Sequence, residues 1–144
     1  MGDDLYREII LEHYARPAHK KKLCCPTHSE EGFNPTCGDE VEIELQIEDG
    51  IIKDIGFGGQ GCSISLASAS MLTCMLCNKS VDYARKLCDC FKARMLTRGE
   101  LSEPELDLED LEALDGVRQY PVRIKCALLA WNTLLQALPQ ENCA

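Results

Sequence analysis

The stretch Val41-Glu42-Ile43-Glu44-Leu45-Gln46-Ile47-Glu48 alternates aliphatic and polar side chains without a break. A period of two places the aliphatic residues on one face of a β-strand and the polar residues on the other. Asp49-Gly50 follows at once, and this dipeptide is a strong signal for a two-residue hairpin turn. The pattern predicts an antiparallel hairpin, 40–48 with 51–57, whose one face is solvent-exposed while helices cover the other.

Helical patterns flank this hairpin on both sides. Apolar spacing predicts a helix over 4–15 that Pro17 ends. Further helices are predicted over 65–77, over 81–95, and around Leu108–Leu114 with an end at Gly116, with a polar loop over 97–107. A last helix starts near Pro121 and carries apolar residues up to Leu138, and Pro139 follows it. We therefore expect an α+β fold, with a small antiparallel sheet of about three strands and helices packed on one face. Residues 1–144 are expected to form a single domain.

The composition of the chain excludes several classes of function. Its 144 residues include 15 Lys and Arg against 24 Asp and Glu, for a net charge of −9. A nucleic-acid-binding protein needs a basic surface, so nucleic acid is not expected as a partner. The sequence contains no apolar run long enough to cross a bilayer, so a membrane is not expected either. The charged N-terminus lacks the apolar stretch of a signal peptide, and we expect a cytoplasmic protein.

Ten cysteines in such a chain need an explanation. Disulfides are rare in the reducing cytoplasm, so we expect metal ligands or reactive thiols, with a disulfide framework as the alternative. Cys37 and Asp39 come just before the first strand of the hairpin and Cys62 just after the second, so all three belong at one end of the sheet. Cys126 completes the set only if the last helix points its start there; otherwise it is a core residue. Three thiolates and one carboxylate make a plausible tetrahedral zinc site.

The other cysteines and the histidines carry weaker signals. The C-x-x-C and C-x-C pairs lie on predicted helices, which have no turn that could wrap a metal ion, so we interpret them as core or incidental thiols. The roles of these remaining cysteines stay open: Cys24, Cys25, Cys74, Cys77, Cys88, Cys90 and Cys143. The three histidines are expected to be exposed or capped imidazoles rather than ligands: His13, His19 and His28.

Three cysteine motifs resemble those of a known family. They read NPTCGD at 34–39, GQGCSISLASASM at 59–71 and PVRIKCALLAW at 121–131. With the N-terminal helix, they make the chain similar to the IscU/SufU family of iron–sulfur cluster assembly proteins, to which the N-terminal part of NifU is related. Lys125 stands where scaffold-type members carry a histidine, and the polar insert around 88–107 is similar to the SufU type.

The resemblance implies a zinc-dependent sulfurtransferase. It implies zinc bound by Cys37, Asp39, Cys62 and Cys126, and Cys37 as the thiol that accepts persulfide sulfur from a SufS-type cysteine desulfurase. Downstream Suf assembly proteins are further implied partners. Arg123 matches a family arginine that would help docking or persulfide handling, the alternative being a surface charge. Because four protein ligands close a zinc site, we expect a histidine of the desulfurase to replace Cys37 and free its thiolate.

Two other functions suit the same residues. The first is a scaffold on which a [2Fe–2S] cluster is assembled and handed on, since thiolates ligate such clusters and a carboxylate ligand would make the cluster labile. Lys125 in place of histidine removes one candidate ligand and weakens that interpretation. The second is a structural zinc module for protein interaction, which would bind zinc tightly and show no thiol reactivity. The metal in vivo, the final sulfur acceptor and the oligomeric state do not follow from the sequence.

Overall fold

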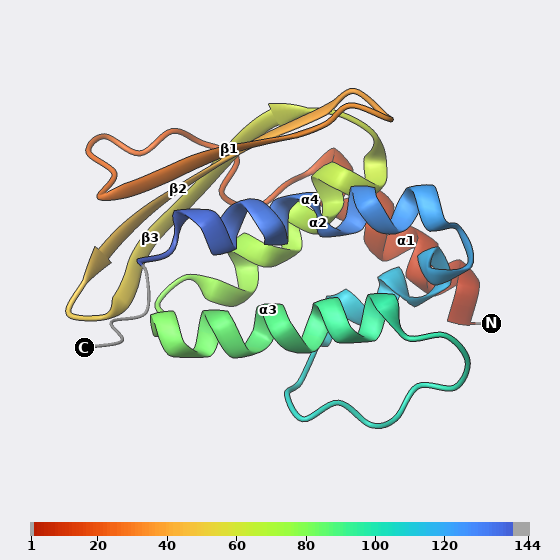
Figure 1. Ribbon diagram of the computed structural model, residues 1–144. Helices are drawn as coiled ribbons and strands as arrows, with labels where there is room; N and C mark the ends of the chain where they lie inside the picture. Colours follow the sequence, from red (N-terminus) through yellow and green to blue (C-terminus); the bar gives the residue numbers. More distant parts are fainter. Residues whose placement is uncertain (1, 140–144) are drawn as a thin grey trace.

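The computed structural model describes residues 2–139 and confirms the predicted α+β fold (Figure 1). Its elements, in chain order, are α1 (Gly2–Ala15), β1 (His28–Asn34), β2 (Asp39–Glu48), β3 (Ile51–Gln60), α2 (Ser63–Leu76), α3 (Val81–Leu96), the 3-10 helix η1 (Glu109–Gln119) and α4 (Pro121–Ala137). The three strands form one antiparallel sheet in the order β1-β2-β3. Cys143 lies outside the described residues.

The β2–β3 hairpin is built as the alternating pattern predicts. Asp49 and Gly50 both have positive φ, 53° and 75°, which is the backbone conformation of a type I′ turn. The aliphatic residues Val41, Ile43 and Leu45 are buried. The hairpin therefore supplies the sheet side of the core.

A β-bulge in β3 changes which residues face that core. The register shifts between Gln46 and Ile47, so Lys53 has no partner on β2. An extra residue in one strand reverses the alternation of its side chains beyond that point. Ile52 and Ile55 are three positions apart, yet both are fully buried for this reason.

Helices α4 and α2 cover one face of the sheet, and α3 lies beyond them (Figure 1). Helix α2 is rich in serine and alanine, and most of its residues are buried. The Ser68 hydroxyl donates to the Ala127 carbonyl at 2.7 Å and accepts a hydrogen bond from Trp131 Nε1 at 3.1 Å. Because these hydrogen bonds satisfy its hydroxyl, Ser68 can be buried where α2 packs against α4 without an uncompensated desolvation penalty.

His13 joins three helices. Its Nδ1 lies 2.8 Å from Ser70 Oγ on α2, and its Nε2 lies 2.8 Å from Asp110 Oδ2 on η1. The Ala18 N–H also donates to Ser70 Oγ at 2.8 Å. Both ring nitrogens are thus paired, and the imidazole holds α1 against α2 and η1.

Strand β1 was not located from the sequence, because the segment 28–34 lacks alternating aliphatic residues. It pairs with β2 along its whole length, from His28 opposite Leu45 to Asn34 opposite Asp39. A Cβ at Gly32 would collide with Thr133 Oγ1 of α4. The missing side chain is what lets α4 lie directly against this strand.

Helix η1 corrects one prediction: Gly116 was expected to end a short helix, but η1 continues through it to Gln119. In a 3-10 helix, residues three positions apart lie above one another. Apolar residues with this spacing form one buried ridge: Leu108, Leu111, Leu114 and Val117. The spacing of three was the signal for a 3-10 helix, and it was overlooked.

The face of the sheet away from the helices is only partly exposed. The Leu23 N–H donates to Glu44 Oε1 at 3.0 Å, and Glu44 is 9% exposed. The His19 carbonyl accepts from the Phe57 N–H of β3 at 3.0 Å. The link between α1 and β1 therefore runs along the edge of β3 and covers part of the face that was predicted to be wet. Within residues 2–139, every helix is too short or too polar to traverse a lipid bilayer.

We expect Gly32→Ala to lower the free energy of unfolding by about 1–3 kcal/mol, because the added methyl group displaces Thr133 from its contact with β1. Urea denaturation would measure the loss. Gly58→Ala is the matched control, since a Cβ there has no heavy atom of residues 2–139 within 4 Å apart from its chain neighbours. An equal loss in both variants would contradict the proposed contact, whereas a Thr133→Ala change should partly restore the stability of Gly32→Ala.

Candidate metal centre

Cys37 lies in the turn that joins β1 to β2. The turn begins after Asn34, whose carbonyl accepts from the Gly38 N–H at 2.8 Å and whose Oδ1 accepts from the Thr36 N–H at 3.2 Å. Gly38 has a φ of 73°, which suits glycine. The turn leaves Cys37 exposed, whereas Asp39, the first residue of β2, is 0% exposed.

Cys62 is the N-cap residue of α2. Its Sγ accepts from the Ser65 N–H at 3.5 Å, so the thiol lies at the positive end of the helix dipole, which favours a negatively charged ligand. Asp39 Oδ1 accepts from the Cys62 N–H at 2.9 Å, and Cys62 Sγ lies 3.7 Å from Asp39 Oδ2. These contacts bring the start of α2 to the start of β2.

Cys126 reaches the same place from the start of α4. Its Sγ lies 3.4 Å from Cys37 Sγ, and Asn34 Nδ2 donates to it at 3.9 Å. Burial raises the pKa of the Cys126 thiol well above its ordinary value, and hydrogen bonds with Asp39 and Cys37 raise it further. Because a metal ligand must be deprotonated, a bound cation is what would convert this thiol to a thiolate.

The structure thus brings all four predicted residues together. The ligand atoms of Cys37, Asp39 and Cys126 lie within 4.8 Å of one another, and Cys62 joins them through its contact with Asp39. Whether α4 points its start toward this cluster was left open by the spacing, and it does. Three thiols and one carboxylate suit a tetrahedral ion such as zinc better than a hard cation that prefers oxygen ligands.

Two residues that support the cluster, Asn34 and Gly61, were not predicted from the sequence to do so. Asn34 shapes the turn with its side-chain oxygen and donates to Cys126 with its nitrogen. Gly61 lies so close that a Cβ would be 2.5 Å from Asp39 Oδ1. The Asn-Pro pair and the glycine before Cys62 were visible signals, but their partners become apparent only in the folded chain.

Arg123 lies in the first turn of α4 and is exposed. It lines a cavity of about 590 Å³ together with Tyr6 and Arg7 of α1 and Ser63 of α2. Ser63 directly follows Cys62, so the cavity adjoins the cluster. A cavity of about 750 Å³ lies between α3 and the loop 97–106, and no residue of the cluster lines it.

The nine cysteines among residues 2–139 are free thiols, with no disulfide between them. Cys88 is buried and donates to the Trp131 carbonyl at 3.6 Å. Burial raises the pKa of Cys88 to about 12, so it is a neutral core residue at physiological pH. Cys74 is exposed on α2, where partial burial of its sulfur and the charges of Asp110 and Glu109 raise its pKa.

We expect Gly61→Ala to weaken metal binding at the cluster by about tenfold or more, because the methyl group pushes the Asp39 carboxylate off the Cys62 N–H. Competition with a chromophoric chelator would measure the affinity. Gly58→Ala, three residues earlier and within β3, should bind metal as the wild type does. Unchanged affinity in Gly61→Ala would mean that Asp39 is not held in place by this contact.

Comparisons with known proteins agree with this geometry. The family model described as "NifU-like N terminal domain" matches residues 5–138. The chain is 39% identical over 140 residues to the zinc-dependent sulfurtransferase SufU of Bacillus subtilis, covering 97% of this chain and 93% of that protein. It is 37% identical over 137 residues to the iron–sulfur cluster assembly scaffold protein IscU of Streptococcus pyogenes, covering 95% and 84%.

A solved structure has the same fold. It is a candidate iron–sulfur cluster assembly scaffold protein for the SUF system from Fervidobacterium islandicum, with a TM-score of 0.82, 31% identity and coverage of 92% of this chain and 95% of that one. The match of the family model spans nearly all of the chain and contains all three cysteine motifs. The chain therefore belongs to the family of NifU-like N-terminal domains, the IscU/SufU family that its cysteine motifs predicted.

Proposed function

We propose that this protein is a zinc-dependent sulfurtransferase that accepts persulfide sulfur from a SufS-type cysteine desulfurase for iron–sulfur cluster assembly. The observation that carries the proposal is an asymmetry within the cluster: Cys37 is exposed in a turn, whereas Asp39 and Cys126 are 0% exposed. One thiol can meet a partner protein while the other ligands stay in place. The name of the Bacillus subtilis relative supports the same activity.

Zinc is the metal that the donor set suits, with Cys37, Asp39, Cys62 and Cys126 as its ligands. When bound, zinc supplies the positive charge that keeps these thiols as thiolates at neutral pH. Asp39 is oriented by the Cys62 N–H, and Cys126 is held by Asn34. These contacts hold two of the ligands in position when Cys37 moves.

Cys37 is the sulfur acceptor in this proposal. Its thiolate attacks the outer sulfur of the desulfurase persulfide, which forms a new S–S bond on Cys37 and breaks the S–S bond of the partner. The electron pair of the broken bond stays on the partner cysteine, which leaves as a thiolate. Sulfur is thus moved without any net oxidation or reduction, and no further reactant is needed.

The surface around Cys37 suits docking of a protein. Phe33 on β1, and Tyr120 and Val122 at the start of α4, are large side chains with about half or more of their surface exposed. Arg123 directly follows Val122 on α4 and adds a positive charge. Apolar side chains beside an arginine are typical of the energetically important centre of an interface.

The second candidate is a scaffold on which a [2Fe–2S] cluster is assembled, as the name of the Streptococcus pyogenes relative says of that protein. The same thiolates would ligate such a cluster. Lys125 is exposed and cannot replace the histidine that scaffold-type members carry there. We therefore rank the scaffold second, and a purely structural zinc module third, because such a module has no use for an exposed ligand.

We expect Cys37→Ala to abolish both sulfur acceptance and stimulation of the desulfurase, while leaving docking largely intact. The measurement is cysteine desulfurase turnover with the zinc-loaded protein and a reductant, together with the mass gain of one sulfur atom on this chain. Cys74→Ala, which removes another exposed thiol, should behave as the wild type does. An active Cys37→Ala protein would contradict the proposal. A stable cluster formed from iron and sulfide, without stimulation of the desulfurase, would favour the scaffold.

We expect Arg123→Ala to raise the concentration of this protein needed for half-maximal desulfurase stimulation by about three- to tenfold, with the maximal rate little changed, because the lost side chain weakens docking and leaves the transfer of sulfur to Cys37 intact. Lys125→Ala is the matched control, since it removes the same charge two residues away on the same helix. Equal effects of the two variants would mean that net charge alone matters. A lowered maximal rate would instead place Arg123 in persulfide handling.

A further inference from the structure

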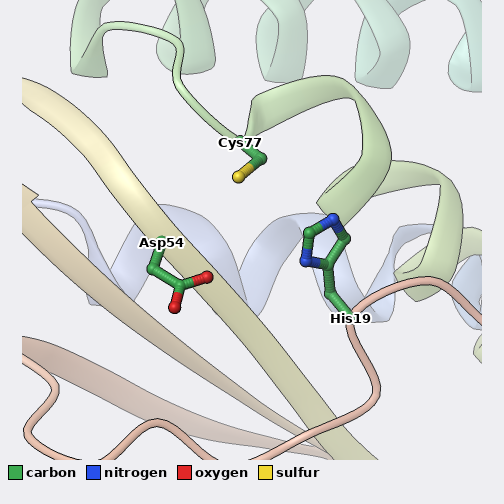
Figure 2. Close-up of side chains that lie close together, drawn as sticks. All are labelled: His19, Asp54 and Cys77. Carbon is green, nitrogen blue, oxygen red and sulfur yellow. The ribbon is translucent and has the colours of Figure 1, made fainter.

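Three side chains with metal-binding atoms converge at the edge of β3, away from the cysteine cluster (Figure 2). They are His19 from the link after α1, Asp54 from β3 and Cys77 from the end of α2. A ring nitrogen, a carboxylate oxygen and the Sγ atom lie within 4.8 Å of one another, and all three residues are partly buried. Figure 2 shows the three side chains around a common space.

The backbone at His19 is tied to β3. Its carbonyl accepts from the Phe57 N–H at 3.0 Å and from the Lys21 N–H at 2.9 Å. His19 has a φ of 54°, a left-handed conformation that is uncommon for residues other than glycine. The surrounding contacts therefore hold a sharp turn at the position that carries the imidazole.

Cys77 is tied to the same strand from the other side. It is the C-cap residue of α2, with its N–H donating to the Thr73 carbonyl at 3.3 Å. The next residue, Asn78, donates its N–H to the Ile52 carbonyl at 2.8 Å, and the Ile52 N–H donates to the Lys79 carbonyl at 2.8 Å. The end of α2 is thereby fixed beside the strand that carries Asp54.

The Asp54 carboxylate is oriented by two neighbouring residues. Its Oδ1 accepts from the Ile55 N–H at 2.9 Å and lies 3.0 Å from Lys21 Nζ, which is 3.3 Å from Oδ2. Lys21 Nζ contacts both carboxylate oxygens, so a cation bound at Asp54 would take the place of this ammonium group. The Lys21 side chain is about half-exposed (46%) and can turn toward solvent.

We propose that His19, Asp54 and Cys77 form a second metal site, for a divalent transition-metal ion of the zinc type. A nitrogen, an oxygen and a sulfur donor together suit such an ion and do not suit calcium or magnesium, which need oxygen ligands. Tetrahedral zinc places its ligand atoms about 3.4–3.7 Å apart, so side-chain rotations that move these atoms by about an ångström would close the site. Three protein ligands leave a fourth position for water or for a side chain of a partner protein.

This site is independent of the cysteine cluster. Cys62 and Cys77 cap opposite ends of α2, whose 14 residues span about 21 Å, so the two sites share no ligand. A metal ion at the second site would cross-link the α1–β1 link, β3 and the end of α2. It would bind the folded chain and not the unfolded one, and would stabilise the fold by mass action.

The test is a zinc titration of the full chain in competition with a chromophoric chelator. The wild type should bind a second equivalent of zinc, which both Cys77→Ala and Asp54→Asn should remove. Cys74→Ala, which removes an exposed thiol one turn earlier on α2, should retain it. With cobalt in place of zinc, Cys77→Ala should lose part of the sulfur-to-cobalt charge-transfer absorption. Zinc should raise the melting temperature of the wild type more than that of Asp54→Asn.

A single equivalent of zinc in the wild type would overturn the second site. So would a second equivalent that persists in both variants, for instance on Cys24 and Cys25. Should Cys77→Ala fail to fold by circular dichroism, Asp54→Asn decides the question, because the amide keeps the size of the side chain. Cys37→Ala should still bind zinc at His19, Asp54 and Cys77, because it changes only the cysteine cluster. Loss of the second site would therefore leave the proposed sulfur transfer untouched.

Discussion

The Asp39 carboxylate is the contact on which the arrangement of this protein depends. It is fully buried at the first residue of β2 and accepts the N–H of Cys62 at the start of α2. A buried carboxylate is costly unless hydrogen bonds or cations compensate it. Asp39 meets that requirement by drawing in the helix N-terminus, and Gly61 leaves the space for the approach. One side chain therefore sets the position of α2 against the sheet and gathers the thiols around a common point.

The same contact separates a fixed part of the cluster from a free one. Asp39 and Cys126 are buried among elements that pack on each other, whereas Cys37 is carried by a turn that β1 and β2 hold only at its ends. A turn can change conformation without disturbing the core, because few buried contacts depend on it. This combination of rigid ligands and one exposed thiol is suited to a group that must be handed between proteins, and less suited to a closed structural site.

Helix α2 is the central element of the molecule. Its small residues let α1, α4 and β3 approach it closely. The buried hydroxyls of Ser68, Ser70 and Thr73 are paired with Trp131, with His13 and with backbone carbonyls. Each end of the helix carries a cysteine beside the sheet, Cys62 at the start and Cys77 at the end. Among residues 2–139, the helix therefore connects the two places where metal-binding side chains converge, even though those places are far apart.

Local pattern was sufficient for the β2–β3 hairpin, its turn at Asp49-Gly50, most helices, and the meeting of Cys37, Asp39 and Cys62 at one end of the sheet. These features depend on alternation, turn chemistry and short loops, which neighbouring residues carry among themselves. Four features could not be predicted from local pattern: strand β1, the approach of Cys126, the support from Asn34, and the cluster of His19, Asp54 and Cys77. Each joins segments distant in the chain, so its residues become neighbours only when α4, α2 and the α1–β1 link pack against the sheet.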